Sequence, residues 1–250
     1  MIRLPSLAAP LALAISFALP AAAFDVAAMS PAEREAFRAE VRAYLLDNPE
    51  IIMEAVSVLE QRQQQAQGDV DRQLIAANAA ELFADGRSWV GGNPEGDVTL
   101  VEFLDYRCGY CRQAFPEVED LLTQDGNIRF IVKEFPVLGE QSVMAAQFAI
   151  AVRLVAGNEA YKTIHNGMMQ FRGDFSEGAL RMYALQQGLD ADAVMEAMKR
   201  PEVMAEIEAN HALATKLKIN GTPGFVIGEH LVRGYVPQAT MAQLVARARD

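Results

Sequence analysis

The sequence predicts an α/β protein: a β-α-β unit, a long helical insertion and a closing β-β-α unit, preceded by an N-terminal helical segment. Three observations support this prediction. The apolar, β-branched run Val98–Leu104 is typical of a buried strand. Residues 139 to 218 have a helical pattern almost throughout. Two short apolar runs, Gly224–Ile227 and 230–232, then precede a last helical stretch at 237–249.

The first 23 residues have the features of a secretory signal peptide. Arg3 gives a short basic start, an alanine- and leucine-rich run follows, and an Ala-x-Ala site predicts cleavage after Ala23. An uncleaved anchor is the alternative. Export would place the two cysteines in a compartment where disulfides persist. No later apolar run is long enough for a transmembrane helix, so we expect no membrane insertion of the mature chain.

Residues 24–90 are predicted to form an N-terminal helical segment. Ser30 and Glu33 have the spacing of a capping box. A stop at 47–49 separates the first helix from a second, whose polar tail at 61–68 is interpreted as a solvated extension or a linker. A third helix is expected at 70–84. The apolar stripes of these helices either pack on the rest of the chain or join copies into a homo-oligomer.

A turn-rich stretch at 85–96 marks the boundary to a domain expected at 91–250. Trp89 either belongs to a short opening strand at 88–90 or covers the domain edge, and the second is favoured. Within the domain we expect a strand at 98–104, a helix at 109–123 and a strand at 127–135. Pro116 should kink that helix or break its first turns. The insertion at 139–218 has breaks near Gly157, Gly173, Gly188 and Pro201.

Cys108 and Cys111, the only cysteines, lie between the predicted strand and the predicted helix. Unpaired N–H groups and the dipole at a helix N-terminus favour a thiolate at position 108, and a second thiol nearby can resolve a mixed disulfide. One alternative is half of a zinc site, completed by histidines 165, 211 and 230. The other is a static disulfide, which would close a short loop and stabilise little. Redox chemistry is favoured.

Two further features accompany the dithiol. Glu102 faces inward if its strand is buried, and Lys133 lies on the next predicted strand. A buried pair of these two residues would stabilise the fold little but could relay protons to and from the thiols. An ordinary edge salt bridge is the alternative. Pro223 follows Thr222 at the head of a strand, where proline cannot continue a ladder and a cis bond would turn the chain back.

Three segments, 102–111, 133–139 and 221–223, resemble the DsbA family of thiol–disulfide oxidoreductases in the thioredoxin superfamily, close to its ScsC-like and Com1-like branch. The resemblance implies a thioredoxin fold with a DsbA-type helical insertion, preceded in the sequence by a helical oligomerisation segment. It implies that Cys108 is the nucleophile, Cys111 the resolving thiol, Glu102 the buried acid and Pro223 a cis-proline facing the dithiol. It also implies a periplasmic location and no cofactor beyond the redox-active disulfide.

The dipeptide Gly109-Tyr110 between the cysteines differs from the Pro-His of DsbA and adds no positive charge, so we expect a Cys108 less acidic than in DsbA. Arg107 would offset part of this if it turned toward the sulfur. Together with Thr222, the dipeptide resembles that of the isomerase DsbC. The favoured prediction is an oligomeric isomerase or reductase of protein disulfides, kept reduced by a membrane partner of the DsbD type.

Two alternatives remain: a monomeric dithiol oxidase recharged by a DsbB-like partner, and a copper-binding chaperone that uses both cysteines as ligands. The methionines of the insertion are interpreted as core filler rather than copper ligands. His165 is expected to stabilise an anion or cap a turn, not to act in catalysis. A formal net charge of −11 argues against nucleic acid and anionic membranes as partners.

Overall fold

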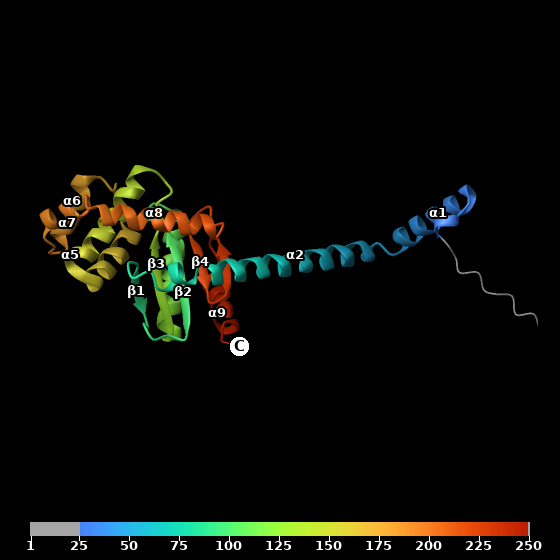
Figure 1. Cartoon of the computed structure of the whole chain (residues 1–250), viewed down its shortest axis with the longest axis horizontal. Helices are drawn as coiled ribbons and strands as arrows, with labels where there is room; N and C mark the ends of the chain where they lie inside the picture. The colour runs from blue at the N-terminus through green and yellow to red at the C-terminus, as the bar shows by residue number, and fades with distance from the viewer. Residues whose placement is uncertain (1–25, 250) are drawn as a thin grey trace, which may run out of the picture. The chain divides into compact units, whose positions relative to one another are not determined.

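The computed structural model describes residues 26–249, which form two compact units (Figure 1). The first comprises the described residues up to Leu59, and the second begins at Glu60. The predicted signal peptide at residues 1–23 lies outside the described residues. Among the helices described, none is both long and apolar enough to cross a membrane.

The first unit consists of a 3-10 turn (η1, Val26–Ala28), helix α1 (Pro31–Asp47) and the start of α2 (Glu50–Ala77). The predicted capping box is present: Glu33 N–H donates to Ser30 Oγ over 3.4 Å, and Ser30 N–H donates to Glu33 Oε2 over 2.9 Å. Many of the unit's large apolar side chains are exposed, namely Phe37, Val41, Tyr44, Leu46, Ile52, Met53, Val56, Val58 and Leu59. Helix α1 therefore has no buried side chain in a single copy of the chain.

Helix α2 is continuous through the glutamine-rich stretch at 61–68, where the sequence suggested a solvated extension or a linker. Glutamine, arginine and alanine are good helix formers, so a polar surface does not interrupt the helix. A short α3 (Ala79–Phe83) follows, which replaces the single helix expected at 70–84. The last part of α2 belongs to the second unit, because Asp71 accepts two hydrogen bonds from Arg233 and Ile75 joins the core. The boundary between units thus precedes the one expected at residue 90.

The second unit contains a five-stranded sheet in the order β1-β3-β2-β4-β5 (Figure 1). Only β2 and β3 pair in parallel, and the other three pairings are antiparallel. The strands are β1 (Trp89–Gly92), β2 (Val98–Leu104), β3 (Ile128–Glu134), β4 (Gly224–Ile227) and β5 (His230–Arg233). The central strands are buried along almost their whole length, as their apolar runs predict.

Trp89 lies in an opening strand, so the favoured interpretation as a mere edge cover is wrong. It pairs with Val132 of β3, its side chain is buried, and its Nε1–H donates to the carbonyl of Asn158 over 3.0 Å. Its ring stacks on Tyr161 with centroids 5.3 Å apart. The pairing with β3 and the indole hydrogen bond hold Trp89 in a strand at the edge of the sheet.

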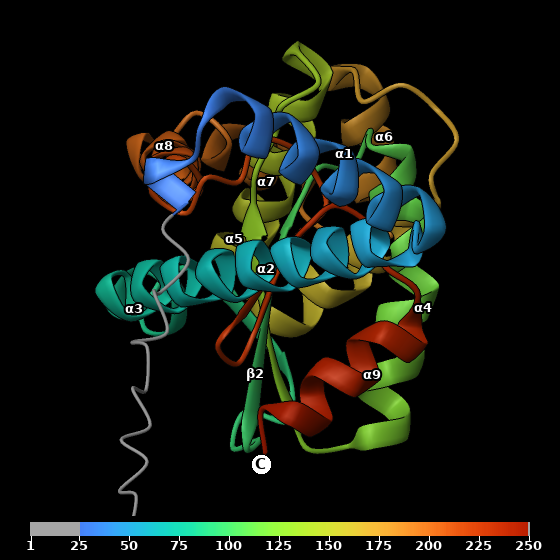
Figure 2. The same cartoon turned by 90° about the vertical axis from the view of Figure 1, so that its right-hand side faces the viewer.

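Helices cover both faces of the sheet. Helix α4 (Gly109–Asp125) and helix α9 (Gln238–Arg247) lie side by side on one face (Figure 2). The opposite face packs against the end of α2, α3 and α8 (Pro201–Lys216). Helix α4 runs through Pro116 and ends at Gly126 in a left-handed conformation, so the predicted break in its first turns does not occur. Pro116 lies on the exposed side of α4.

The helical insertion comprises α5 (Glu140–Gln170), α6 (Glu177–Gln186), α7 (Ala191–Ala197) and α8. The predicted breaks are present: Gly157 interrupts α5 with φ +85°, Gly173 lies in the α5–α6 loop, Gly188 has φ +73°, and Pro201 begins α8. A β-α-β unit, this insertion and a closing β-β-α unit form the thioredoxin fold of the DsbA type that the sequence predicts.

Candidate active site

The dithiol lies at the junction of β2 and α4, where one buried carboxylate fixes the chain. Asp105 accepts hydrogen bonds from the N–H groups of Arg107, Val137 and Leu138 over 2.8, 2.8 and 3.0 Å. It also accepts the hydroxyl hydrogen of Ser142 over 2.8 Å. The N–H of Cys108 donates to the carbonyl of Asp105 over 3.0 Å. The turn that presents Cys108 is therefore tied to the loop after β3 and to the start of α5.

Cys108 is the N-cap residue of α4 and has an acidified thiol. Both thiols are free, and Cys108 keeps 7 % of its surface exposed. The pKa of Cys108 is lowered to about 5, and the largest cause is the hydrogen bond from the Cys111 thiol. Partial burial opposes this decrease. The amides of Cys111 and Tyr110 and the side chain of Thr222 lower it further. At neutral pH Cys108 is therefore a thiolate, because its pKa lies far below that of a free thiol.

Cys111 has the opposite environment. Its side chain has no exposed surface, and burial raises its pKa far above that of a free thiol. The hydrogen bond that it donates to Cys108 and the nearby Glu102 raise it further. Cys108 is thus ionised and slightly exposed, whereas Cys111 is protonated and enclosed.

The Thr222–Pro223 peptide bond is cis, which the sequence could not decide. It brings the start of β4 against the dithiol: the Cys108 Sγ lies 3.2 Å from the carbonyl oxygen of Thr222. The dithiol and the Thr222–Pro223 pair therefore meet at one site, as the resemblance implied, although Cys108 and Thr222 are 114 residues apart in the sequence.

Glu102 lies beneath the dithiol on β2. Its side chain is 3 % exposed, and Oε1 has no hydrogen-bond partner among the described residues. Burial raises the pKa of Glu102 to about 8, and the negative charge of Cys108 adds to the increase. The carboxyl group is therefore protonated at neutral pH, next to the thiol that must lose a proton.

Lys133 does not pair with Glu102, so the predicted buried pair is wrong. In the parallel register of β2 and β3, Glu102 lies opposite Val132, and successive side chains of a strand point to opposite faces. The ammonium group of Lys133 instead donates to Asp85 Oδ2 over 2.8 Å and to the Glu81 carbonyl over 2.7 Å. Lys133 thus anchors the α3 region on the far face of the sheet and lies outside the active site. The alternative of an edge salt bridge with Glu102 is wrong as well.

Sequence reasoning missed a buried cluster behind the dithiol, formed by Tyr106, Glu134, Tyr161 and His165. Tyr106 and Tyr161 donate to Glu134 Oε1 over 2.8 and 2.6 Å. Because the phenol hydrogen of Tyr106 goes to Glu134, the Nδ1–H of His165 donates to its oxygen over 3.1 Å. Burial raises the pKa of Glu134 to about 8 despite these bonds. Glu134 lies in the segment 133–139, which resembles the DsbA family, but nothing in the sequence indicated its hydrogen-bond partners.

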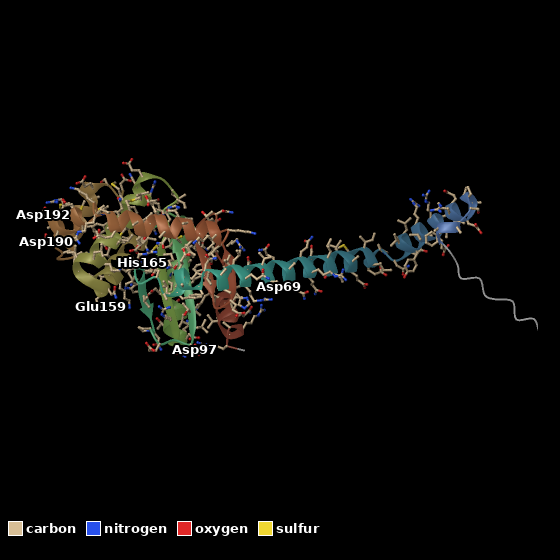
Figure 3. The ribbon with its side chains drawn as sticks, in the orientation of Figure 1. Asp69, Asp97, Glu159, His165, Asp190 and Asp192 are labelled. Carbon is tan, nitrogen blue, oxygen red and sulfur yellow. The ribbon has the colours of Figure 1, made fainter. Side chains whose placement is uncertain are left out.

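His165, labelled in Figure 3, is neither a turn cap nor an anion ligand. Burial lowers its pKa to about 4, so the ring is neutral, and it packs against Trp89, Tyr106, Phe115 and Tyr161. Arg107 does not turn to the sulfur either, because its Nη1 donates to the Leu138 carbonyl over 3.0 Å. Within the described part of the chain, no three His, Cys, Asp or Glu side chains group as metal ligands would.

A thioredoxin fold with an acidified, slightly exposed cysteine three residues from an enclosed one defines a thiol–disulfide oxidoreductase. Residues 84–247 match the sequence profile of the family described as thioredoxin. The chain belongs to this family. Residues 33–66 match the profile described as the N-terminal domain of the copper resistance protein ScsC, which agrees with the ScsC-like resemblance.

Solved structures of similar proteins agree with this assignment. A thioredoxin-like oxidoreductase from Silicibacter pomeroyi DSS-3 is 44 % identical, covering 68 % of this chain and 96 % of its own, with a TM-score of 0.65. The thiol-disulfide exchange protein α-DsbA2 from Wolbachia pipientis is 26 % identical (73 % and 97 % covered; TM-score 0.68). A periplasmic thioredoxin-like protein from Salmonella enterica serovar Typhimurium is 28 % identical (68 % and 94 % covered; TM-score 0.60).

Among curated relatives, a protein named Na(+)/H(+) antiporter NhaA 1 from Salinispora arenicola is 31 % identical over 142 residues. The match covers 56 % of this chain and 22 % of that protein. The chain therefore spans about a fifth of the length of this relative.

Proposed function

We propose that this chain is a periplasmic, homo-oligomeric disulfide isomerase or reductase that acts on protein disulfides. The observation that carries the proposal is the division of labour within the dithiol. Cys108 has a pKa of about 5 and keeps 7 % of its surface exposed, whereas Cys111 is protonated and enclosed. Such a pair attacks with one defined sulfur and keeps the second in reserve.

The reaction begins when the Cys108 thiolate attacks one sulfur of a client disulfide. A Cys108–client disulfide forms, the client bond breaks, and the other client sulfur leaves as a thiolate that takes a proton from water. In the isomerase reaction, another client thiolate attacks the mixed disulfide, forms a new client disulfide and returns the Cys108 thiolate. No net electrons are transferred.

In the reductase reaction, Cys111 loses its proton and attacks the sulfur of Cys108. The Cys108–Cys111 disulfide forms, the mixed disulfide breaks, and the client leaves as a second thiolate. The client gains two electrons and the dithiol loses two, which a membrane partner of the DsbD type would restore from its own dithiol. Formation of the mixed disulfide removes the Cys108 charge, which lowers the pKa of Glu102. Glu102 then releases its own proton to water, and the carboxylate so formed accepts the Cys111 proton.

The first unit supports the oligomeric part of the proposal. An apolar groove of about 430 Å³ on α1 and the start of α2 is lined by Phe37, Val41, Leu45, Leu46 and Ile52, together with two arginines. A monomer would leave this surface in water, whereas packing copies of the unit would bury it. The match of residues 33–66 to an ScsC N-terminal domain and the predicted export signal also support the proposal.

Four measurements test the proposal. Trapping thiols in living cells should find Cys108 and Cys111 reduced, since an oxidised pair would indicate a dithiol oxidase recharged by a DsbB-like protein. Light scattering on the mature chain should give an oligomer, and a monomer would remove the main support for isomerase activity. Cys111→Ser should trap mixed disulfides with clients. Tight copper binding by the reduced chain, without turnover of scrambled ribonuclease, would indicate a copper chaperone instead.

A matched pair of variants separates assembly from chemistry. Val41→Glu places a charge in the apolar groove. Val41 is exposed in a single copy of the chain, so the charge should disturb only the packing between copies and dissociate the oligomer. The dissociated protein should lose isomerase activity on scrambled ribonuclease while keeping the reduction of a small disulfide. Arg34→Ala, an exposed change on the same helix that does not line the groove, should leave both properties unaltered.

A further inference from the structure

We propose that an arginine-lined groove beside the dithiol binds an acidic side chain of the polypeptide whose cysteine is exchanged at Cys108. The groove is formed by Arg112 and Arg172 with the apolar side chains of Phe115, Pro116 and Met169, and encloses about 440 Å³. This inference rests on the proposed function, because it specifies which disulfides the site prefers.

The groove lies on the helix that begins at the dithiol. Arg112 follows Cys111 in the first turn of α4, and Phe115 and Pro116 continue the same helix. Met169 lies in the last turn of α5, and Arg172 follows that helix. A third arginine, Arg107, precedes Cys108. A chain joined to Cys108 would therefore have its flanking residues close to these cationic groups.

The positive charge of the three arginines is not neutralised. No carboxylate of the described residues lies within salt-bridge distance of Arg107, Arg112 or Arg172. The guanidinium groups of Arg107 and Arg112 are oriented instead by main-chain carbonyls, those of Leu138 and Tyr106, over 3.0 and 2.7 Å. A carboxylate that approaches the groove finds the guanidinium group of Arg112 already fixed in place.

The positive charges of the cluster repel one another. Partial burial lowers the pKa of Arg112, and the charges of Arg172 and then Arg107 lower it further. The nearby Asp105 opposes this effect, but its oxygens already accept four hydrogen bonds from the active-site loops and Ser142. An external anion bound between these like charges would offset their repulsion.

The lining determines the kind of occupant. Phe115, Pro116 and Met169 supply an apolar wall, so a small inorganic anion would leave part of the groove unfilled. A peptide segment that carries a glutamate or aspartate next to an apolar residue matches both parts of the surface. Electrostatic complementarity of this kind acts on association rate and on discrimination between partners more than on total affinity.

The test uses the reduced full-length chain and three symmetric disulfide-linked peptides. The peptides are identical except that the residue two positions after their single cysteine is glutamate, glutamine or lysine. Each reaction moves two electrons from Cys108 and Cys111 to the peptide disulfide and releases two peptide thiols, which are measured at low ionic strength. The glutamate peptide should react about 5- to 10-fold faster than the glutamine peptide, and the lysine peptide more slowly than both. The preference should diminish as salt is added.

Arg172→Glu should bring the glutamate-to-glutamine rate ratio to one or below. Arg200→Glu provides the matched control, because this exposed arginine at the start of α8 makes the same charge change and does not line the groove. It should keep the wild-type ratio. A wild-type ratio of one, or equal loss in both variants, would overturn the inference and leave the proposed function intact. Failure to reduce the glutamine peptide as well would overturn the proposed function itself.

Discussion

The phenol hydroxyl of Tyr106 donates a hydrogen bond to the Glu134 carboxyl group over 2.8 Å, with both side chains almost fully buried. This bond joins the turn before Cys108 to the end of β3. Tyr161 of α5 donates to the same oxygen over 2.6 Å, so the cluster also reaches the helical insertion. The position of the dithiol thus depends on a polar cluster in the interior as well as on the apolar core.

Replacing Tyr106 with phenylalanine should destabilise the protein by about 1–3 kcal/mol, because Glu134 and His165 each lose a buried partner. Urea unfolding of the oxidised protein would measure this change. Tyr110→Phe is the control, since Tyr110 is exposed and lies beside the same dithiol. If both variants unfolded at the same urea concentration as the wild type, the buried hydrogen bonds would contribute nothing to stability.

The reactivity of Cys108 should follow its lowered pKa. The rate of alkylation by iodoacetamide should rise with pH to a plateau with a midpoint near pH 5, because only the thiolate reacts. Thr222→Val should move the midpoint upward, since the hydrogen bond from the threonine side chain favours the thiolate. Mass spectrometry should locate the label on Cys108 and leave the enclosed Cys111 unmodified. A midpoint near that of a free cysteine would contradict the structure.

The sequence predicted the fold well because the signals that determine it are local. The apolar run of β2, the glycine breaks of the insertion and the capping box of α1 each act within a few residues, and the structure confirms them. The cysteine spacing likewise indicated the chemistry, because two residues between cysteines at a helix start are themselves a local signal.

The errors concern relationships that the sequence does not contain. Glu102 and Lys133 lie on adjacent strands, but the register of β2 against β3 determines which face each side chain meets, and a shift of one residue reverses the answer. Trp89 was misplaced because its strand pairs with β3, which follows it by some forty residues. Glu134 and the arginine groove depend on α5, which only the folded chain brings to the dithiol.

Lys133→Met should reduce stability without altering the active site. The ammonium group has no exposed surface and binds Asp85, whose pKa it helps to lower to about 2 against the effect of burial. Removing it leaves Asp85 with Arg87 at 3.9 Å and the hydrogen bonds from Arg87 and Ser88, so the lost charge-assisted bond should cost about 1.5–3 kcal/mol. Urea unfolding would measure the loss, and the double variant Asp85→Asn/Lys133→Met should recover part of it. The alkylation midpoint of Cys108 should stay near pH 5, whereas a shift would restore a role for Lys133 at the dithiol.

Glu102→Gln should change how stability depends on pH. The folded pKa of Glu102, about 8, lies above the ordinary value of 4.5, so the folded state holds its proton over a range in which the unfolded state has lost it. Its stabilising contribution is complete below pH 4.5 and is lost as the pH rises to 8. Between these limits the free energy of unfolding of a protein with Glu102 should fall by about 4 kcal/mol relative to the glutamine variant.

Urea unfolding at pH 4, 6 and 8 would measure this difference, with both cysteines replaced by serine so that no thiol titrates. Glu134→Gln in the same background should remove a similar pH dependence, since burial raises the pKa of that carboxyl group to about 8 as well.

The rate at which mixed disulfides are released distinguishes the roles of Glu102 and Glu134. In the protein with both cysteines, Glu102→Gln should slow the release of mixed disulfides by Cys111, because a glutamine cannot accept the thiol proton. Glu134→Gln, which has no contact with either sulfur, should leave the release rate unchanged. Parallel pH curves for wild type and Glu102→Gln would show that the carboxyl group beneath the dithiol titrates as it would in water.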